Sequence, residues 1–332
     1  MKIKKKHLNI GLVLLAIVIL IAAAHYYIKA KDAKNQNTKN PQEPDTSSEK
    51  MLWSVDTDGY LHYPLDRGTV KFRRDDYSKT NSSVISKVIF ESNRGNIYGL
   101  LVLPKNISEP LPGVVLLPGA GVSKESELNL AKRISELGAA VLTIDQRGVG
   151  ETGGIFPTLD QDYASFLKAQ EPYQHLMVYD ALRAYDLLKS APFIDPDRII
   201  IAGESLGGRI AIIAVSIDRK IKGALVISSS GFDFKGIGDP KKDIFLKSID
   251  SDRYIESITP RKLVMMHNMQ DKIIPLSSAI KSYSKAQEPK RLVLMNETSC
   301  NHGYCDSMYQ GLVESLDFLD DIGSKTIFSV KT

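Results

Sequence analysis

Short apolar runs alternate along the chain with longer segments in which apolar residues recur every three or four positions. Apolar runs bounded by turn residues are typical of buried strands, and they occupy residues 113–117, 140–144, 198–202, 221–227, 262–266 and 290–295. The periodic segments predict helices at residues 128–137, 173–188, 208–215, 277–286 and 309–322. Strands that alternate with helices in this way predict an α/β fold, with a mostly parallel twisted sheet and helices on both faces.

Two further runs, residues 84–91 and 96–103, are separated only by the turn sequence Ser92-Asn93-Arg94-Gly95. This spacing predicts a hairpin. Because a hairpin joins antiparallel strands, we expect it to form an antiparallel N-terminal edge of the sheet. Sheets of this class bind ligands at the carboxyl ends of their parallel strands. Those ends are therefore where reactive side chains are expected.

The N-terminal residues have a different pattern. Every residue between Lys6 and Lys29 is uncharged, and most are Leu, Ile, Val or Ala. About 20 apolar residues cross a bilayer as a helix. Residues 1–30 are therefore predicted to be a single-pass membrane anchor that meets the lipid bilayer through residues 8–28. The alternative is a cleaved signal peptide, with the three alanines at 22–24 as its cleavage site.

Polar sequence follows the anchor. Four lysines precede the apolar segment, which favours a cytoplasmic N-terminus and a C-terminal domain outside the cytoplasm. Cleavage of the segment would instead release a secreted protein. Residues 31–50 contain alanine as their only apolar residue type, so they are predicted to be a flexible linker. The remaining residues, 51–332, are predicted to form the α/β domain.

Charge also differs between residues 1–50 and the rest of the chain. The 332 residues carry a formal net charge of +4. Residues 1–50 hold nine lysines against four acidic residues, whereas the rest of the chain holds 34 basic and 35 acidic residues. The basic excess thus belongs to the predicted membrane end. A nearly neutral domain does not favour a nucleic-acid partner.

The sequence Gly203-Glu204-Ser205-Leu206-Gly207 lies between a predicted strand and a predicted helix. A serine on such a sharp strand-to-helix turn is typical of a nucleophile elbow. The turn leaves room only for small residues two positions before and after the serine, which explains the two glycines. The start of the helix also directs N–H groups and a partial positive charge toward the serine. An isolated match of this kind can equally be a glycine-rich turn, so the surrounding residues must support it.

A serine hydroxyl needs a general base, and His302 is the candidate because it follows the last predicted strand in a turn. His175, at the start of a helix, is expected at the surface. The base needs a carboxylate to fix its tautomer. Asp271 follows a strand and is the candidate, and the rivals are three aspartates after the preceding strand: Asp233, Asp239 and Asp243.

The order Ser205…Asp271…His302 is that of the α/β-hydrolases. From about residue 84 to 325 the chain resembles the dienelactone hydrolase and prolyl-oligopeptidase-like group of that superfamily. The stretches that carry the resemblance are Tyr98-Gly99-Leu100-Leu101-Val102-Leu103-Pro104, Leu116-Leu117-Pro118-Gly119-Ala120-Gly121, Asp145-Gln146-Arg147-Gly148-Val149-Gly150-Glu151-Thr152, residues 203–208 and residues 267–275. The resemblance implies an α/β-hydrolase fold with a small cap or none, no cofactor and no metal.

The resemblance also implies an oxyanion hole made by the N–H groups of Ala120 and Leu206. In one respect the chain departs from the family, which usually has His-Gly where this chain has Pro118-Gly119. Backbone donors do not depend on that histidine, but the second donor, Ala120, is less firmly assigned for this reason. In relatives the stretch around Arg147 is mostly structural, and we interpret Arg147 as supporting loops.

Two long segments, 153–171 and 231–259, contain aromatic residues that include Phe156, Phe232 and Phe245. Long loops in compact domains often shape binding pockets. Ordinary core packing by a short extra helix is the alternative for each segment.

Cys300 and Cys305 flank His302 and are the two cysteines of the chain. In an exported domain they are expected to form a disulfide that holds the histidine loop. The alternatives are a metal site made with His302 and a pair of free thiols.

Together these features predict a serine hydrolase that cleaves a carboxylic ester, a small molecule, on the outer side of a membrane. A peptidase or amidase that acts on short peptides is the alternative with the same chemistry. The alternative without this chemistry is a catalytically silent binding scaffold.

Overall fold

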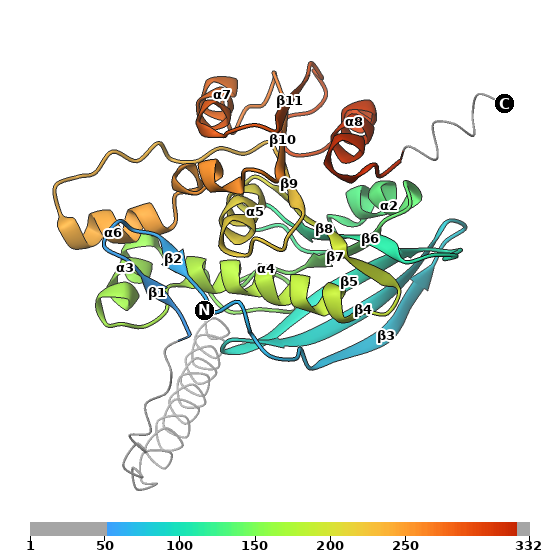
Figure 1. Ribbon diagram of the computed structural model, residues 1–332, viewed down its shortest axis with the longest axis horizontal. Coiled ribbons are helices and arrows are strands. Elements are labelled where there is room, and N and C mark those ends of the chain that lie inside the picture. The colour runs from blue at the N-terminus through green and yellow to red at the C-terminus, as the bar shows by residue number, and fades with distance from the viewer. Residues whose placement is uncertain (1–51, 324–332) are drawn as a thin grey trace, which may run out of the picture. The chain divides into compact units, whose positions relative to one another are not determined.

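Nine strands form the central sheet of the computed structural model, which describes residues 52–323 (Figure 1). Six neighbouring strands are parallel, in the order β11 (Lys290–Met295), β10 (Lys262–Asn268), β9 (Gly223–Ile227), β8 (Ile194–Glu204), β6 (Leu111–Leu117) and β7 (Ala140–Ile144). The sheet continues past β7 with three antiparallel strands, β5 (Gly95–Pro104), β4 (Ser83–Ser92) and β3 (Phe72–Lys79). The predicted parallel sheet with an antiparallel N-terminal edge is confirmed.

Helices pack on both faces of this sheet (Figure 1). One face is covered by α4 (Tyr173–Ser190), α5 (Leu206–Ile217) and α7 (Leu276–Lys285). The other face is covered by α2 (Leu128–Glu136) and α8 (Tyr309–Asp320). All five predicted helices are present. The difference from the predicted bounds that matters for the site is in α5. This helix begins at Leu206, directly after the serine, and not at residue 208.

Several elements were not predicted. Every residue of β3 is exposed, so this edge strand lacks the apolar alternation that identifies a half-buried strand. Helices α3 (Leu159–Leu167) and α6 (Pro240–Ser248) lie within the two long aromatic segments. The short strands β1 (Ser54–Val55) and β2 (Leu61–His62) pair with each other, and the 3-10 helices are η2 (Ser251–Arg253), η3 (Ile255–Ile258) and η4 (Asp306–Met308).

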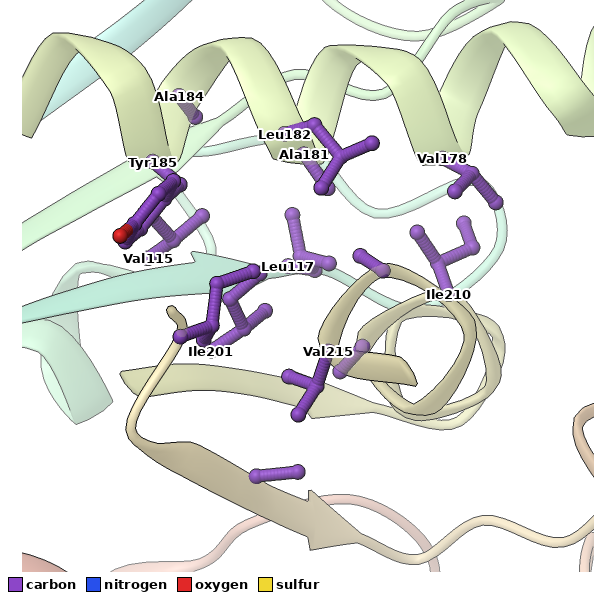
Figure 2. Packing of buried hydrophobic residues seen from close by; sticks show 14 of the residues in the cluster. Val115, Leu117, Val178, Ala181, Leu182, Ala184, Tyr185, Ile201, Ile210 and Val215 are labelled. Carbon is purple, nitrogen blue, oxygen red and sulfur yellow. The ribbon is translucent and has the colours of Figure 1, made fainter. Parts of the chain in front are cut away.

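Buried apolar side chains form one cluster on each face of the sheet. Along β6, Val115 and Leu117 belong to one cluster while Val114 and Leu116 belong to the other, as the alternation of a strand requires. Figure 2 shows side chains of α4, among them Leu182, pointing toward β6. Each fully buried Val or Leu contributes about 1.5–3 kcal/mol. This packing fixes the strands whose carboxyl ends carry the candidate site.

The predicted anchor and linker, residues 1–50, lie outside the described residues. Between Leu52 and Gly323, no helix has both the length and the apolar character needed to cross a bilayer.

Candidate active site

Ser205 sits at the turn between β8 and α5, as the sequence predicts for a nucleophile elbow. Its backbone has φ 51° and ψ −115°, a combination that L-residues rarely adopt and that costs about 1–3 kcal/mol. Hydrogen bonds with the end of β9 and the residues after it stabilise this strained conformation. The N–H of Ser205 donates to the carbonyl of Ile227 at 3.0 Å, and the Ser229 hydroxyl donates to the Ser205 carbonyl at 2.6 Å.

The glycines around the serine are required by close backbone contacts. A Cβ on Gly203 would lie 2.3 Å from the carbonyl carbon of Gly207. A Cβ on Gly207 would lie 2.1 Å from the carbonyl oxygen of Leu117, at the end of β6. These distances are far below van der Waals contact, so neither position accepts a side chain. The two glycines allow β6, β8 and α5 to approach closely enough to form the elbow.

His302 and Asp271 are in direct contact. The imidazole Nδ1 lies 2.9 Å from Oδ2 and 3.0 Å from Oδ1 of Asp271. An ionised carboxylate only accepts hydrogen bonds, so Nδ1 carries the proton and donates it to Asp271. The Asp271 side chain is 0% exposed, whereas that of His302 is 25% exposed. The ring therefore reaches solvent while its carboxylate partner is protected from it.

The environment of Asp271 keeps its carboxylate ionised. Burial by itself raises the pKa of Asp271, but hydrogen bonds outweigh this effect and the pKa is lower than usual. The donors are the N–H of Ile274, at 2.8 Å, the His302 ring, and the N–H of Ile273, at 2.9 Å. An ionised partner at this position fixes the tautomer of the imidazole and stabilises its protonated form.

The serine and the histidine loop meet at the carboxyl edge of the sheet. Glu204, the residue before the serine, accepts a hydrogen bond from the N–H of Tyr304 at 3.0 Å. A Cβ on Gly303 would lie 2.6 Å from the Glu204 carboxylate. The residues that follow His302 are thus in contact with the residue that precedes Ser205. Across residues 52–323, neither the Ser205 hydroxyl nor Nε2 of His302 makes a hydrogen bond, so both groups are available to a ligand.

The loop that carries His302 is fastened to the end of β10 by one side chain. The amide nitrogen of Asn268 donates to the carbonyls of Glu297, at 2.9 Å, and Cys300, at 2.6 Å. Its amide oxygen accepts the N–H of Glu297 at 2.9 Å. The sequence analysis did not select Asn268, although its place at the end of a predicted strand was a usable signal.

Cys300 and Cys305 form a disulfide with a Cα–Cα distance of 5.9 Å. The predicted bridge is therefore present, and the free-thiol and metal-ligand alternatives are wrong. In the part of the chain that the structure describes, no group of three His, Cys, Asp or Glu side chains is arranged to hold a metal ion.

Both predicted oxyanion donors lie beside the serine. Leu206 is the first residue of α5, so its N–H has no acceptor within the helix. Ala120 is exposed just after β6, and its neighbour Gly119 would bring a Cβ to 3.5 Å from the Cβ of Ser205. Pro118 shapes this turn through its carbonyl, which accepts a hydrogen bond from the Gln146 side chain.

The rival carboxylates are engaged elsewhere. Asp233 pairs with lysines, Lys285 among them at 2.8 Å, and Asp239 caps the start of α6. Asp243 accepts the N–H of Ile237 at 2.8 Å. The structure therefore brings only Asp271 of these candidates to His302.

The expectation that His175 lies at the surface was wrong. The ring is fully buried and Nε2 lies 2.7 Å from the Ser248 hydroxyl. Burial lowers the pKa of His175 to about 3, so the ring is neutral and acts as a packing residue. The position of His175 at a helix start gave no sign of this burial. The aromatic side chains that cover the ring belong to α3 and α6, which were not placed from the sequence.

Arg147 has a supporting role, as the sequence analysis proposed. Its guanidinium donates to both carboxylate oxygens of Asp180, at 2.7 and 2.8 Å, and to the carbonyl of Asn93. The preceding residues of this stretch were missed. Asp145 is fully buried and binds the Lys124 ammonium at 2.8 Å and the Lys124 N–H at 2.8 Å. These contacts brace the segment that follows the Ala120 turn.

The two long aromatic segments combine both alternatives raised by the sequence. Phe245 and Tyr254 are buried, and Phe245 packs against Tyr163 and Phe166 of α3. These residues belong to the core. Phe156 and Phe232 are instead 46% and 51% exposed. The exposed pair follows β7 and β9, at the same edge as Ser205.

Glu204 and Glu127 form a buried pair of acidic side chains that the sequence analysis missed. Burial raises the pKa of Glu127, and the neighbouring Glu204 charge adds to this effect, to about 9. Burial also raises the pKa of Glu204, to about 7, although the Tyr304 N–H and His302 oppose it. Glu127 is thus protonated at neutral pH. Glu204 was visible within the elbow motif, but nothing in the sequence placed Glu127 beside it.

Comparisons with known proteins identify the family and the fold. The family model of acetyl xylan esterase (AXE1) matches residues 53–238. "Uncharacterized protein YfhR" of Escherichia coli O157:H7 is 30% identical over 141 residues, which are 40% of this chain and 49% of that protein. The chain thus spans about half the length of this relative.

Solved structures show the same fold. An acetyl xylan esterase from Paenibacillus sp. R4 superposes with a TM-score of 0.61 at 21% identity, over 75% of this chain and 88% of that one. Acetyl Xylan Esterase 1 from Thermoanaerobacterium sp. JW/SL YS485 gives 0.61 at 17% identity, over 76% and 89%. The family model reaches from the first described strands through the nucleophile elbow and covers more than half of the chain, so the protein belongs to the acetyl xylan esterase (AXE1) family of carboxylic-ester hydrolases in the α/β-hydrolase superfamily.

Proposed function

We propose that the protein hydrolyses carboxylic esters through an acyl-enzyme formed on Ser205. The observation that carries this proposal is the strained Ser205 at the same sheet edge as the Asp271–His302 pair. A strained backbone persists only where the surrounding structure holds it, and such positions concentrate at functional sites. An imidazole whose Nδ1 is bound by a carboxylate has Nε2 available as a general base.

In the proposed mechanism, the Ser205 hydroxyl attacks the ester carbonyl while Nε2 of His302 takes its proton. The N–H groups of Ala120 and Leu206 stabilise the oxyanion, and each such donor typically contributes about 3 kcal/mol in the transition state. The protonated imidazole then gives the proton to the leaving alcohol, which departs. Water attacks the acyl-enzyme with His302 again as the base, and the acid is released. Asp271 stays ionised throughout and stabilises the imidazolium.

The substrate is proposed to be a small ester. The family name refers to acetyl groups on xylan, so short acyl groups on sugar hydroxyls are the first substrates to test. We also propose that the catalytic domain acts outside the cytoplasm, held to the membrane through residues 8–28. The lysines before the apolar segment and the Cys300–Cys305 disulfide support this location.

Labelling with a fluorophosphonate probe tests the mechanism directly. The wild type is expected to be labelled, and Ser205→Ala is expected to lose labelling and to lower kcat by about 10⁴-fold or more while the fold is kept. Ser284→Ala is a matched control, because this exposed hydroxyl only donates to the carbonyl of Lys281. A folded wild type that is not labelled would favour the silent-scaffold alternative.

Substrate class is tested with p-nitrophenyl esters of graded acyl length against aminoacyl amides. We expect the short esters to be cleaved fastest. A clear preference for the amides would favour a peptidase. For the location, protease added to intact cells that express the full chain is expected to degrade the catalytic domain. Protection until the membrane is opened would contradict the proposed orientation.

A further inference from the structure

Arg209 is a partly buried arginine on the first turns of α5, four residues after the serine. A guanidinium has five N–H donors and stays protonated at every relevant pH. Within the described range 52–323, no carboxylate lies within salt-bridge distance of Arg209 and no acceptor is hydrogen-bonded to it. Burial lowers the pKa of Arg209, and a partly buried charge without a partner is unfavourable. The guanidinium nitrogens still reach solvent, where a ligand can meet them.

Other inward-facing arginines of the described residues are paired. Arg67 binds Asp186 and Asp218, Arg147 binds Asp180, and Arg198 binds Asp320. Arginines are mostly exposed in folded proteins and, where they are buried, are usually paired. Arg209 differs from these arginines, and also from Arg261, which has no carboxylate partner among the described residues but donates to the carbonyls of Ile258 and Asp218.

An aromatic ring holds the Arg209 guanidinium in place. The Cζ atom of Arg209 lies 4.4 Å from the centre of the Phe232 ring, a cation–π geometry. The nearest compensating charge belongs to Asp250, which opposes the lowering of the Arg209 pKa by burial. The Asp250 carboxylate is occupied by the N–H groups of Phe232, at 2.8 Å, and Phe234, at 3.0 Å. These contacts of Asp250 fix the loop that carries Phe232. The guanidinium N–H groups of Arg209 are left without an acceptor.

Arg209 lies close to the proposed nucleophile. Its N–H donates to the Ser205 carbonyl at 3.3 Å, so the two residues are one helical turn apart. Side chains of a helix lean toward its N-terminus, which here is the elbow. The loop that carries Phe232 also contacts the elbow, because the Ser229 hydroxyl binds the Ser205 carbonyl at 2.6 Å.

We propose that Arg209 binds an anionic group, a carboxylate on the acyl portion of the ester substrate. The planar guanidinium fork matches a carboxylate in bidentate geometry, and the Phe232 ring on one face leaves the N–H edge for the ligand. An anion there is separated from the reacting carbonyl by the few bonds of a short acyl chain. The proposal rests on the assignment of Ser205 as nucleophile and adds a substrate class to it: esters of dicarboxylic acids in which one carboxylate is free.

The test compares two esters of equal chain length. Mono-p-nitrophenyl glutarate has a free carboxylate where p-nitrophenyl valerate has a methyl group. We expect the wild type to favour the glutarate in kcat/KM, and Arg209→Gln to lower the glutarate-to-valerate ratio by about 10- to 100-fold, mainly through KM. Arg209→Lys keeps the charge without the fork and is expected to give an intermediate ratio. High salt is expected to reduce the wild-type preference.

Arg291→Gln is the matched control, because Arg291 also lies over an aromatic ring, 4.3 Å from the centre of Phe318, but at β11 and α8. It should keep the wild-type ratio. Equal ratios for the wild type and Arg209→Gln would overturn the proposal.

A binding measurement separates this proposal from the catalytic one. Glutarate is titrated calorimetrically into Ser205→Ala and into the double variant Ser205→Ala/Arg209→Gln, neither of which needs to turn over substrate. Binding to the first and loss of binding to the second would support the anion site even if esterase activity were not found. No binding to either, or equal binding to both, would overturn it, whatever the outcome of the Ser205 labelling.

Discussion

The nucleophile elbow and the histidine loop carry the proposed catalytic groups, and the fold holds them in different ways. The elbow lies between central strands and is fixed by backbone contacts, since Gly203 and Gly207 leave no space for a Cβ. The histidine loop follows the edge strand β11 and includes exposed residues. Side chains hold it: Asn268, the Cys300–Cys305 bridge and Glu204.

This difference indicates where each segment is vulnerable. The elbow depends on close packing, so small additions of volume should disrupt it completely. The histidine loop depends on several separate contacts, so the loss of one should loosen it by degrees. The residues that hold the loop also include two that are distant in sequence, Asn268 and Glu204. The experiments below test this comparison, from the largest expected effect to the smallest.

Gly207→Ala should have the largest effect. The added Cβ would lie 2.1 Å from the Leu117 carbonyl oxygen, so either β6 or α5 must move. We expect the free energy of unfolding to fall by more than about 3 kcal/mol and the remaining folded protein to lose Ser205 labelling.

Gly138→Ala is the control for this change. Gly138 has a positive φ, 100°, and open space around its Cβ position, whereas Gly207 lies within α5, has no positive φ and has crowded surroundings. For Gly138→Ala only about 1 kcal/mol of backbone strain is expected. Urea unfolding measures both variants. A loss for Gly207→Ala no larger than that for Gly138→Ala would show that close approach does not require glycine in the elbow.

Asn268→Ala should be the most damaging single change to the histidine loop. It removes two hydrogen bonds donated to the Glu297 and Cys300 carbonyls and two accepted from the N–H groups of Glu297 and Gln270. Leaving buried groups unpaired costs about 1–3 kcal/mol. We expect kcat/KM for p-nitrophenyl acetate to fall by about 100-fold while Ser205 stays in place. Asn296→Ala, which loses only an exposed contact with Gln270, should stay close to wild type.

The disulfide is expected to have a smaller effect. Closing such a short loop contributes about 2 kcal/mol, and it restrains the backbone on both sides of His302. Reduction, or the double change Cys300→Ser/Cys305→Ser, should lower activity by about tenfold or less, and the double variant should not respond to reductant. Equal activity of the bridged and reduced wild type, with the bridge state verified by mass spectrometry, would remove the bridge from the list of restraints.

The smallest expected effect concerns the acidic pair of Glu127 and Glu204, of which Glu204 also contacts the histidine loop. In the unfolded chain Glu127 and Glu204 lose their protons near pH 4.5, whereas in the folded protein their pKa values are about 9 and about 7. The folded state therefore binds more protons between these limits, and stability falls as pH rises through them. Glu127→Gln should flatten this decline, so that its advantage over wild type grows from pH 5 to pH 9.

Urea unfolding at pH 5, 7 and 9 measures this change. Glu314→Gln, on the exposed face of α8, is the control and should follow the wild-type curve. A wild type whose stability rises from pH 5 to pH 9 would contradict the assignment of a protonated Glu127.

Local sequence determined the elements and most of their order, because apolar periodicity records which faces a helix or strand buries. The parallel strands, the hairpin edge and the five covering helices were predicted. β3 was not, since its residues are exposed on both faces. Helix α6 was raised only as an alternative for residues 231–259, although Asp239 and Pro240 mark its start.

For the site, the sequence by itself pointed to Ser205, because the glycines that a tight turn needs lie beside it, and to Asp271 and His302 through their places after strands. Contacts between distant residues were decided only by the tertiary structure. Glu127 lies beside Glu204, Asn268 holds the loop of Cys300, and His175 is buried under α6. The sequence also could not show that Arg209 has no carboxylate partner among the described residues, because the residues packed around a charge decide whether it is paired. The physical reason is that backbone conformation follows from nearby residues, whereas burial and pairing depend on which surfaces meet.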